Sequence, residues 1–227
     1  MSKIEPYIYP QGKWMQQRAG SFTSSQIGNL FTEPKTKAAK EAGELSETAK
    51  TYIMDKAAEL LTGTIRNTYT TPEMQWGIDN EPSAVEMLRL KGNPDLIYYG
   101  SDNPRFFIFS DFSGGSPDAV DDKTVFEVKC PNPRTHIEYL LSDNLFEMNK
   151  TYWYQLQMNM ACVAREYDWN VMDMDGIFAS YCPLMIDPKL RLKKINIKPD
   201  EEFQSKLPVL INNAENYLRS IISKFDL

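Results

Sequence analysis

The sequence predicts an α+β (mixed α/β) fold in which a central mixed β-sheet is flanked by helices. The first third of the chain places apolar residues at helical spacing, whereas the middle contains short aromatic or β-branched runs separated by Gly, Asn and Asp. Further strand-like runs and an amphipathic C-terminal segment follow. We expect one domain with a helical part over 1–92, a sheet and crossing helix over 93–182, and a strand and helix over 189–225.

Local patterns place the individual elements. A first helix should end at Gly63, and Pro82 must either start a new helix or kink the second one. The role of the polar loop 35–43 stays open. The expected elements are helices over 46–61, 72–90, 149–163 and 200–225, antiparallel strands over 96–99, 106–112 and 124–128, and further strands over 169–172, 177–181 and 192–197.

Composition limits the class of protein. With 227 residues, 42% hydrophobic and 12% aromatic, the chain can bury a sizeable core. No apolar run approaches the roughly 20 residues that cross a bilayer, and the first residues given lack the basic-then-apolar pattern of a secretion signal, so we expect a cytoplasmic protein without a membrane partner. The net charge of -6 argues mildly against a nucleic-acid partner unless positive charge is concentrated locally.

Cysteine and histidine are too few for several kinds of chemistry. Cys130, Cys162 and Cys182 are odd in number and widely spaced, which favours buried thiols over a disulfide framework or a cysteine-zinc site. His136 is the single histidine and should lie, without a catalytic role, on a helix after the 124–128 strand. The remaining chemistry must use carboxylates, lysine and hard metal ions.

The segment around 124–131 carries the candidate chemistry. Side chains alternate along a strand, so Glu127 and Lys129 should share one face. The Gly-containing segment 113–118 is interpreted as a flexible turn that brings Asp118 to Glu127. Two carboxylates, a backbone carbonyl and waters suit Mg²⁺, and the lysine can orient or deprotonate a water that attacks a phosphodiester. The alternative is a solvated strand face with an ion pair worth less than about 1 kcal/mol.

Four segments together resemble the phage lambda exonuclease or YqaJ-like viral recombinase family of the PD-(D/E)xK nuclease superfamily. They span about 14–160, and the chain after about Cys162 matches no further motif. The segments are Trp14-x3-Arg18-x-Gly20 with Thr23-Ser-Ser25, Trp76-Gly77 with Glu81 and Ala84, Ser116-Pro117-Asp118 with Glu127-Val128-Lys129-Cys130-Pro131, and Tyr152-x2-Gln155-x-Gln157.

The resemblance implies a restriction-endonuclease-like core and a role for each matching residue. Asp118, Glu127 and the carbonyl of Val128 would bind Mg²⁺, for which Mn²⁺ substitutes, Lys129 would activate the water, and Glu81 would lie beside them. One glutamine of the crossing helix would line the site, but two glutamines two residues apart cannot face the same way. The implied 5'-phosphate ligands are Arg18, Ser25 and Thr23, and the glutamine is Gln155 or Gln157.

These residues also have ordinary interpretations. Arg18 could be a surface arginine, and Glu81 an acid favoured near a helix start by the helix dipole. Trp14 and Trp76 are expected in the core whatever the function.

The function that the resemblance implies is a recombination exonuclease. Such an enzyme degrades linear double-stranded DNA from the 5' end and leaves 3' overhangs, in the host cytoplasm if the gene is phage or prophage encoded. Its expected partners are DNA ends, further copies in a ring-like trimer, and a single-strand annealing protein. One alternative is a structure-specific or restriction-like endonuclease. The other is a non-catalytic DNA-end-binding recombination accessory protein, against which the intact Asp118, Glu127 and Lys129 count.

Overall fold

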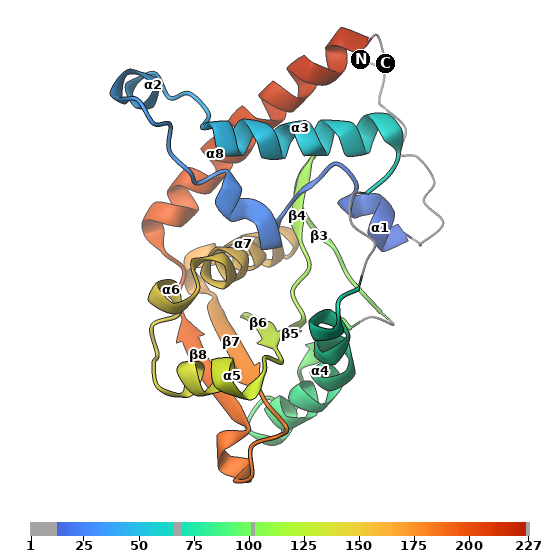
Figure 1. Ribbon diagram of the computed structural model, residues 1–227, viewed down its shortest axis with the longest axis vertical. Coiled ribbons are helices and arrows are strands. Elements are labelled where there is room, and N and C mark those ends of the chain that lie inside the picture. Colours follow the sequence, from blue (N-terminus) through green and yellow to red (C-terminus); the bar gives the residue numbers. More distant parts are fainter. Residues whose placement is uncertain (1–12, 66–69, 101–102, 226–227) are drawn as a thin grey trace.

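A computed structural model describes residues 13–65, 70–100 and 103–225. Among these residues, a mainly helical first part is followed by five strands, three α-helices, two further strands and the longest helix (Figure 1). The α-helices are α1 (Lys13–Arg18), α2 (Lys37–Glu41), α3 (Glu47–Thr62), α4 (Pro72–Leu90), α5 (Pro133–Leu140), α6 (Leu145–Met148), α7 (Lys150–Glu166) and α8 (Glu201–Ile222). The strands are β1 (Phe22–Thr23), β2 (Ile97–Tyr98), β3 (Phe107–Ser110), β4 (Ser113–Gly115), β5 (Ala119–Asp121), β6 (Thr124–Lys129), β7 (Asp175–Tyr181) and β8 (Leu192–Ile197).

The described strands form two sheets. The larger has the order β2-β5-β6-β7-β8, with β6 and β7 parallel and the other neighbours antiparallel. The smaller has the order β1-β4-β3, with β1 parallel to β4 and β3 antiparallel to it. The predicted mixed sheet flanked by helices is therefore confirmed.

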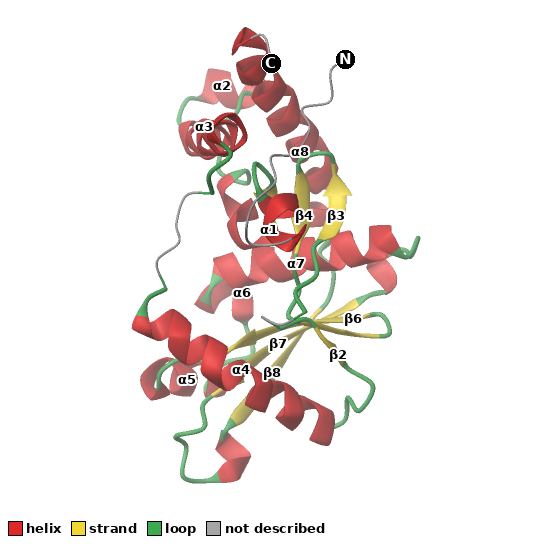
Figure 2. Ribbon diagram, turned by 90° about the vertical axis from the view of Figure 1, so that its right-hand side faces the viewer, coloured by secondary structure: helices red, strands yellow, loops and turns green. Residues whose placement is uncertain are grey.

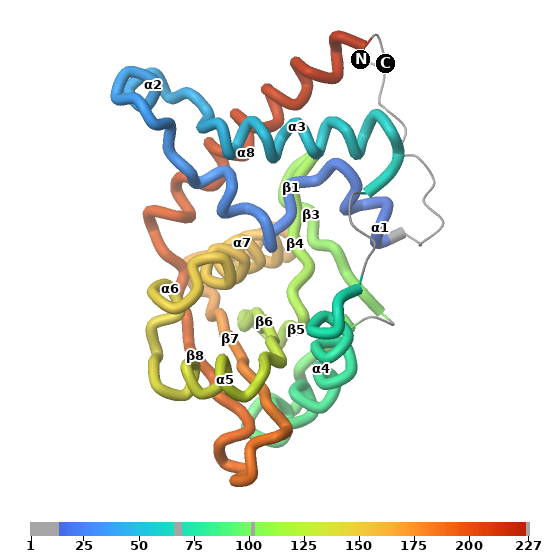
Figure 3. The backbone as a smooth tube through the Cα atoms, in the orientation of Figure 1, coloured from blue at the N-terminus to red at the C-terminus, as the bar shows by residue number. Residues whose placement is uncertain are grey.

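Helix α7 lies between the two sheets. Figure 2 shows the larger sheet on one side of α7 and strands β3 and β4 on the other. Helices α3 and α8 pack against each other on the side of the smaller sheet, as the backbone tube in Figure 3 shows. The connection from β6 to the parallel strand β7 runs through α5, α6 and α7, so the helix predicted to cross the sheet does so.

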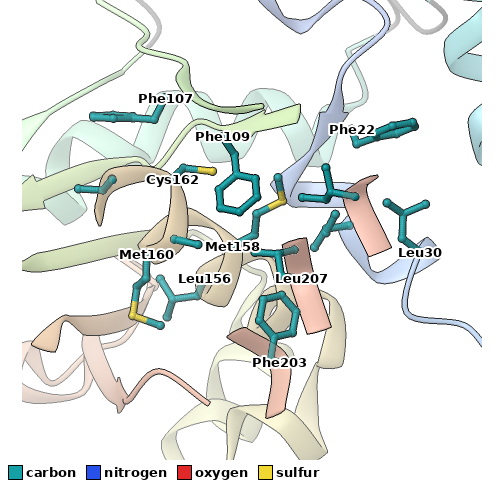
Figure 4. Close-up of a cluster of buried hydrophobic side chains, with 14 of the residues drawn as sticks. Phe22, Leu30, Phe107, Phe109, Leu156, Met158, Met160, Cys162, Phe203 and Leu207 are labelled. Carbon is teal, nitrogen blue, oxygen red and sulfur yellow. The ribbon is translucent and has the colours of Figure 1, made fainter. Parts of the chain in front are cut away.

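The two faces of the larger sheet are buried against different helices. On one face, Val125 and Phe178 join the main core with α7 and α8, part of which is drawn in Figure 4. On the other face, Phe126 and Val128 join a second core with Ala84 and other residues of α4. The alternation of side chains along β6 thus directs odd-numbered residues towards α7 and even-numbered residues towards α4.

Polar caps set where the long helices begin. The side chains of Ser46, Thr71, Asn149 and Asp200 each accept a hydrogen bond from a backbone N–H in the first turn of α3, α4, α7 and α8. Gly63 ends α3 in the left-handed conformation, as expected. Helix α4 continues through Pro82, so of the two alternatives the start of a new helix does not occur.

Three further expectations are corrected. The segment 169–172 is not a strand, because the side chain of Asn170 accepts from the N–H of Met172 and closes a 3-10 turn over Val171–Asp173. The run 106–112 forms β3 but belongs to the smaller sheet. The segment 113–118 is not a flexible turn, because Ser113–Gly115 is the buried strand β4.

Close packing explains the glycines of β4. A Cβ on Gly114 would lie 2.5 Å from the ring of Phe106, and one on Gly115 would lie 2.3 Å from Oδ1 of Asn159. These glycines therefore permit close approach rather than flexibility.

Within the described ranges, no helix has the length and apolarity needed to cross a membrane.

Candidate active site

Strands β5 and β6 bring Asp118 next to Glu127. Asp118 directly precedes β5, and its backbone N–H donates to the carbonyl of Phe126 at 3.1 Å. The Oδ2 atom of Asp118 accepts from the N–H of Val128 at 2.6 Å. The antiparallel pairing of β5 and β6 therefore fixes the first carboxylate beside the strand that carries the second.

The ammonium group of Lys129 lies among three oxygens. Its Nζ donates to Oε1 of Glu127 in a short contact and to the carbonyl of Val128 at 3.0 Å. It also lies 3.6 Å from Oδ2 of Asp118. The predicted convergence of two carboxylates and a lysine is present in the structure, and the backbone carbonyl belongs to the same group.

Burial and mutual repulsion raise the pKa of two acids here. Burial, and secondly the charge of Asp118, raises the pKa of Glu127 to about 8, against the opposing effect of Lys129. Burial and Asp118 similarly raise the pKa of Glu81 to about 7, although the hydroxyl of Tyr98 donates to Glu81 at 2.9 Å. Glu81 belongs to the same electrostatic group, because the charges of Asp118 and Lys129 both act on its pKa.

The carboxylates hold Lys129 in its charged form. Burial alone would lower the pKa of this lysine, but the charges of Asp118 and Glu127 outweigh burial and raise it. The Nζ atom also lies 5.5 Å from the ring centroid of Tyr152 on α7, a cation–π contact. One ammonium therefore faces three acidic side chains, and the raised pKa values of Glu81 and Glu127 show that it does not offset all three charges.

Helix α7 presents one face to this cluster. Tyr152 contacts Lys129, and Nδ2 of Asn159 donates to Oε2 of Glu127 at 3.2 Å. Gln155 lies three residues after Tyr152 and four before Asn159, which places it on the same helical face.

Gln157 lies on another face of α7, so its assignment to the site is corrected. Its amide donates to the carbonyl of Lys198 at 2.8 Å and accepts from the N–H of Asp200 at 3.0 Å. These bonds join α7 to the beginning of α8. Of the two candidate glutamines, Gln155 is the one that shares the helical face of Tyr152 and Asn159.

The part of the site with Arg18, Thr23 and Ser25, called the arginine end below, contacts the segment that carries Asp118. Nη1 of Arg18 contacts Oγ of Ser116 at 3.4 Å, and Nε1 of Trp14 donates to the same oxygen at 3.0 Å. The guanidinium lies 4.5 Å from the ring centroid of Trp14. Arg18 is half-buried and burial lowers its pKa, so it is not an ordinary surface arginine. Trp14 is also only half-buried, which corrects the expectation that it is a core residue.

The two hydroxyl residues of this end lie near a buried tyrosine. Thr23 and Ser25 contact each other through their side-chain oxygens at 3.3 Å. The N–H of Thr23 donates to the hydroxyl of Tyr52 at 3.1 Å, and the charges of Arg18 and Tyr52 affect each other. Arg18 and Thr23 therefore both lie near Tyr52, and Ser25 lies beside Thr23.

The oxygens around Lys129 suit a hard divalent cation. Asp118, Glu127 and the Val128 carbonyl already surround one cationic group. Within residues 13–65, 70–100 and 103–225, no group of three His, Cys, Asp or Glu side chains has a metal-holding arrangement. Two carboxylates, a carbonyl and waters nevertheless form the kind of set that Mg²⁺ accepts, because this ion keeps several waters. The residues present therefore fit the ion.

Sequence reasoning missed three contacts of this site. The sequence gives Ser116 only as part of a motif, Tyr98 only as a strand residue and Asn159 no role, whereas all three contact residues of the site. The signal for Asn159 is a polar residue between two apolar ones, Met158 and Met160, in a segment expected to be a helix.

His136 lies on α5, as expected, away from this chemistry. It is fully buried, with Nδ1 2.8 Å from Oγ of Ser180 and Nε2 2.7 Å from the carbonyl of Leu190. Its contacts join α5, β7 and the segment before β8.

Comparison with solved structures finds the same fold in three exonuclease structures. The alkaline exonuclease LHK-Exo from Laribacter hongkongensis superposes with a TM-score of 0.73 at 21% identity, covering 94% of this chain and 95% of that chain. The structure of LHK-Exo in complex with dAMP gives 0.72 at 21% identity, with coverage of 93% and 94%. A phage-related exonuclease from Haemophilus somnus 129PT gives 0.70 at 20% identity, with coverage of 90% and 96%.

The chain belongs to the family of YqaJ-like viral recombinase domains, whose model matches residues 13–166, more than half of the sequence. The resemblance inferred from the four motifs is thereby confirmed. No curated protein matches the chain significantly.

Proposed function

We propose that this chain is a metal-dependent exonuclease that hydrolyses linear double-stranded DNA from the 5' end and leaves 3' overhangs for recombination. The observation that carries the proposal is the convergence of Asp118, Glu127 and the Val128 carbonyl on the Lys129 ammonium. Membership of the YqaJ-like family supports it. The direction of digestion and the overhang rest on that family resemblance.

The residues at the start of β5 and at the end of β6 have different roles in the proposed hydrolysis. Asp118, Glu127 and the Val128 carbonyl would hold Mg²⁺, with Mn²⁺ as a substitute. The ion, when bound, supplies Lewis-acid chemistry that lowers the pKa of a coordinated water and neutralises charge on the phosphate. Lys129 keeps its proton in the metal-free protein, so we assign it the role of orienting the attacking water or a phosphate oxygen by donation. Glu81 and Gln155 complete the polar wall beside these groups.

The arginine end would bind the terminal phosphate. A guanidinium and hydroxyl groups can together donate several hydrogen bonds to a phosphate, and Arg18 and Ser116 already lie together. Thr23 and Ser25 add two hydroxyls nearby. Because Ser116 is two residues from Asp118, a phosphate held there would lie on the segment that leads into the acidic cluster. LHK-Exo has been solved with dAMP, a nucleotide of the kind that such an enzyme releases.

The remaining partners follow from the family resemblance alone. We propose DNA ends as the substrate, a ring-like trimer as the assembly, and a single-strand annealing protein as a partner. A ring would place positive charge on an inner channel and leave the net charge of -6 to the outside.

Digestion of three DNA substrates tests the proposal. Linear duplex with 5'-phosphate, linear duplex with 5'-hydroxyl and closed circular duplex are incubated with Mg²⁺ or with EDTA. We expect release of mononucleotides from linear DNA with Mg²⁺ only, no cleavage of the circle, and loss of about 10²–10⁴-fold in rate for Lys129→Ala. Cleavage of the circle would indicate the endonuclease alternative, and binding of ends without cleavage by the wild type would indicate the accessory-protein alternative.

The arginine end is tested with the same linear substrates. We expect Arg18→Ala to remove the preference for the 5'-phosphate, by roughly 10- to 100-fold in kcat/KM, because a charged hydrogen-bond partner is lost. Arg134→Ala is the matched control, since Arg134 is an exposed arginine of α5 that pairs only loosely with Glu138 at 3.6 Å. An unchanged preference for the 5'-phosphate in Arg18→Ala would contradict the proposal that Arg18 binds this phosphate.

A further inference from the structure

Glu127 has different partners on its two oxygens. Oε1 receives the ammonium of Lys129, whereas Oε2 accepts from Nδ2 of Asn159 at 3.2 Å. Asn159 comes from α7, 32 residues further along the chain, and its side chain is fully buried. The amide therefore reaches the carboxylate from the helix that covers this face of the sheet.

The amide of Asn159 is an unusual choice for its position. Its neighbours in sequence, Met158 and Met160, are buried in the main core, and Oδ1 of Asn159 is buried without a hydrogen-bond partner among the described residues. An unpaired buried oxygen costs about 1–3 kcal/mol, which an apolar side chain would avoid. Packing alone would therefore favour a residue such as Leu here.

The surroundings make room for this amide. A Cβ on Gly115 would lie 2.3 Å from Oδ1 of Asn159, so any larger residue in this part of β4 would push the amide away. The orientation of the amide follows from this bond, in which Nδ2 of Asn159 is the donor and Oε2 of Glu127 the acceptor. Both the helix and the neighbouring strand thus allow a donor directed at Oε2 of Glu127.

We propose that Asn159 is a positioning residue of the metal site, which holds Oε2 of Glu127 and thereby keeps Oε1 directed at the cation position beside Asp118. The proposal rests on the function proposed above and deepens it, because it assigns the orientation of a metal-binding carboxylate to α7. Groups that orient metal ligands in this way typically change metal affinity by about 10–100-fold.

Calorimetric titration with Mn²⁺, without DNA, tests the proposal. We expect Asn159→Leu, which removes the donor and keeps the number and branching of the side-chain heavy atoms, to bind Mn²⁺ about 10- to 100-fold more weakly than the wild type. We expect its melting temperature without metal to be equal or higher, since the unpaired Oδ1 is also removed. Asn159→Ala, which only removes atoms, takes its place if the leucine variant does not fold.

Gln157→Leu is the matched control. Gln157 is a buried amide on the same helix, but it joins α7 to the start of α8 instead of contacting the cluster. We expect it to lower the melting temperature and leave Mn²⁺ affinity unchanged, so loss of affinity in both variants would point to general damage and overturn the role of Asn159.

Two outcomes separate this proposal from the one on which it rests. Equal Mn²⁺ affinity in wild type and a folded Asn159 variant would overturn the positioning role and leave the nuclease proposal standing. No Mn²⁺ uptake by the wild type, together with no digestion of linear DNA, would overturn both.

Discussion

Two buried charged clusters of this protein differ in how their charges are balanced. On α3, Lys56 donates to both oxygens of Glu59 at 2.9 and 3.0 Å, and Glu59 also accepts from the N–H of Gly20 at 3.0 Å. Each charge there has an opposite charge beside it, and the charge of Glu59 also acts on Arg18. At the end of β6, the carboxylates of Glu81, Asp118 and Glu127 share the single ammonium of Lys129.

This difference in charge balance distinguishes a structural cluster from a functional one. In a balanced buried pair, the attraction between the two charges offsets the free-energy cost of removing them from water. Glu59, paired in this way, also accepts a hydrogen bond from the backbone of Gly20 in the turn after Arg18. An unbalanced cluster raises the pKa of its own acids, because like charges without water repel. We therefore interpret the first cluster as structural and the second as one that a divalent cation would complete.

The largest effect should come from Asp118→Asn. This change keeps an acceptor for the N–H of Val128 but removes a charge, so we expect nuclease activity to fall by about 10³-fold, equivalent to about 4 kcal/mol. The melting temperature in EDTA should stay equal or rise, because the negative excess is reduced. Digestion assays and thermal melts measure both quantities. A marked drop in the melting temperature would show that the acidic cluster supports the fold as the Lys56 pair does.

The second effect is on stability and concerns Lys56→Met. Removing one partner leaves Glu59 buried without its opposite charge, so we expect the free energy of unfolding to fall by about 3 kcal/mol in urea titrations. Mn²⁺ affinity should not change. Lys50→Met on the same helix is the control, because its pair with Glu47 is exposed and should contribute less than about 1 kcal/mol. Equal stability of the two variants would contradict the structural role of the buried pair.

The smallest effect is on the pH dependence of the metal-free protein. The pKa of Glu81 is raised from 4.5 to about 7, so within that window the folded protein holds a proton that the unfolded chain has released. The free energy of unfolding contributed by this group is therefore full below the window and is lost as pH rises through it. We expect Glu81→Gln, which keeps an acceptor for Tyr98, to reduce this fall by about 1–2 kcal/mol, allowing for partial exposure.

Urea titrations in EDTA at pH 5 and pH 8 measure this difference. Parallel pH profiles for wild type and Glu81→Gln would show that Glu81 is not part of the unbalanced cluster.

Local patterns predicted much of the fold. The helices near 46–61 and 149–163 and the strand 192–197 agree with α3, α7 and β8, because caps and apolar periodicity act over a few residues. The predictions for 169–172 and 113–118 were wrong. In the first segment a local hydrogen bond decides the structure, and in the second contacts with other parts of the chain do. Asn170 closes a turn with its own backbone, whereas the glycines of β4 are needed because Phe106 and Asn159 approach them closely.

The sequence by itself determined the chemistry of the site on β5 and β6. Strand alternation placed Glu127 and Lys129 on one face, and the short connection kept Asp118 beside them. Only the tertiary structure decided that Arg18 meets Ser116, 98 residues away, that Asn159 rather than Gln157 reaches Glu127, and that Glu81 joins the acids. Alternation and periodicity act along one element, whereas these contacts depend on how α1, α4 and α7 pack against the strands.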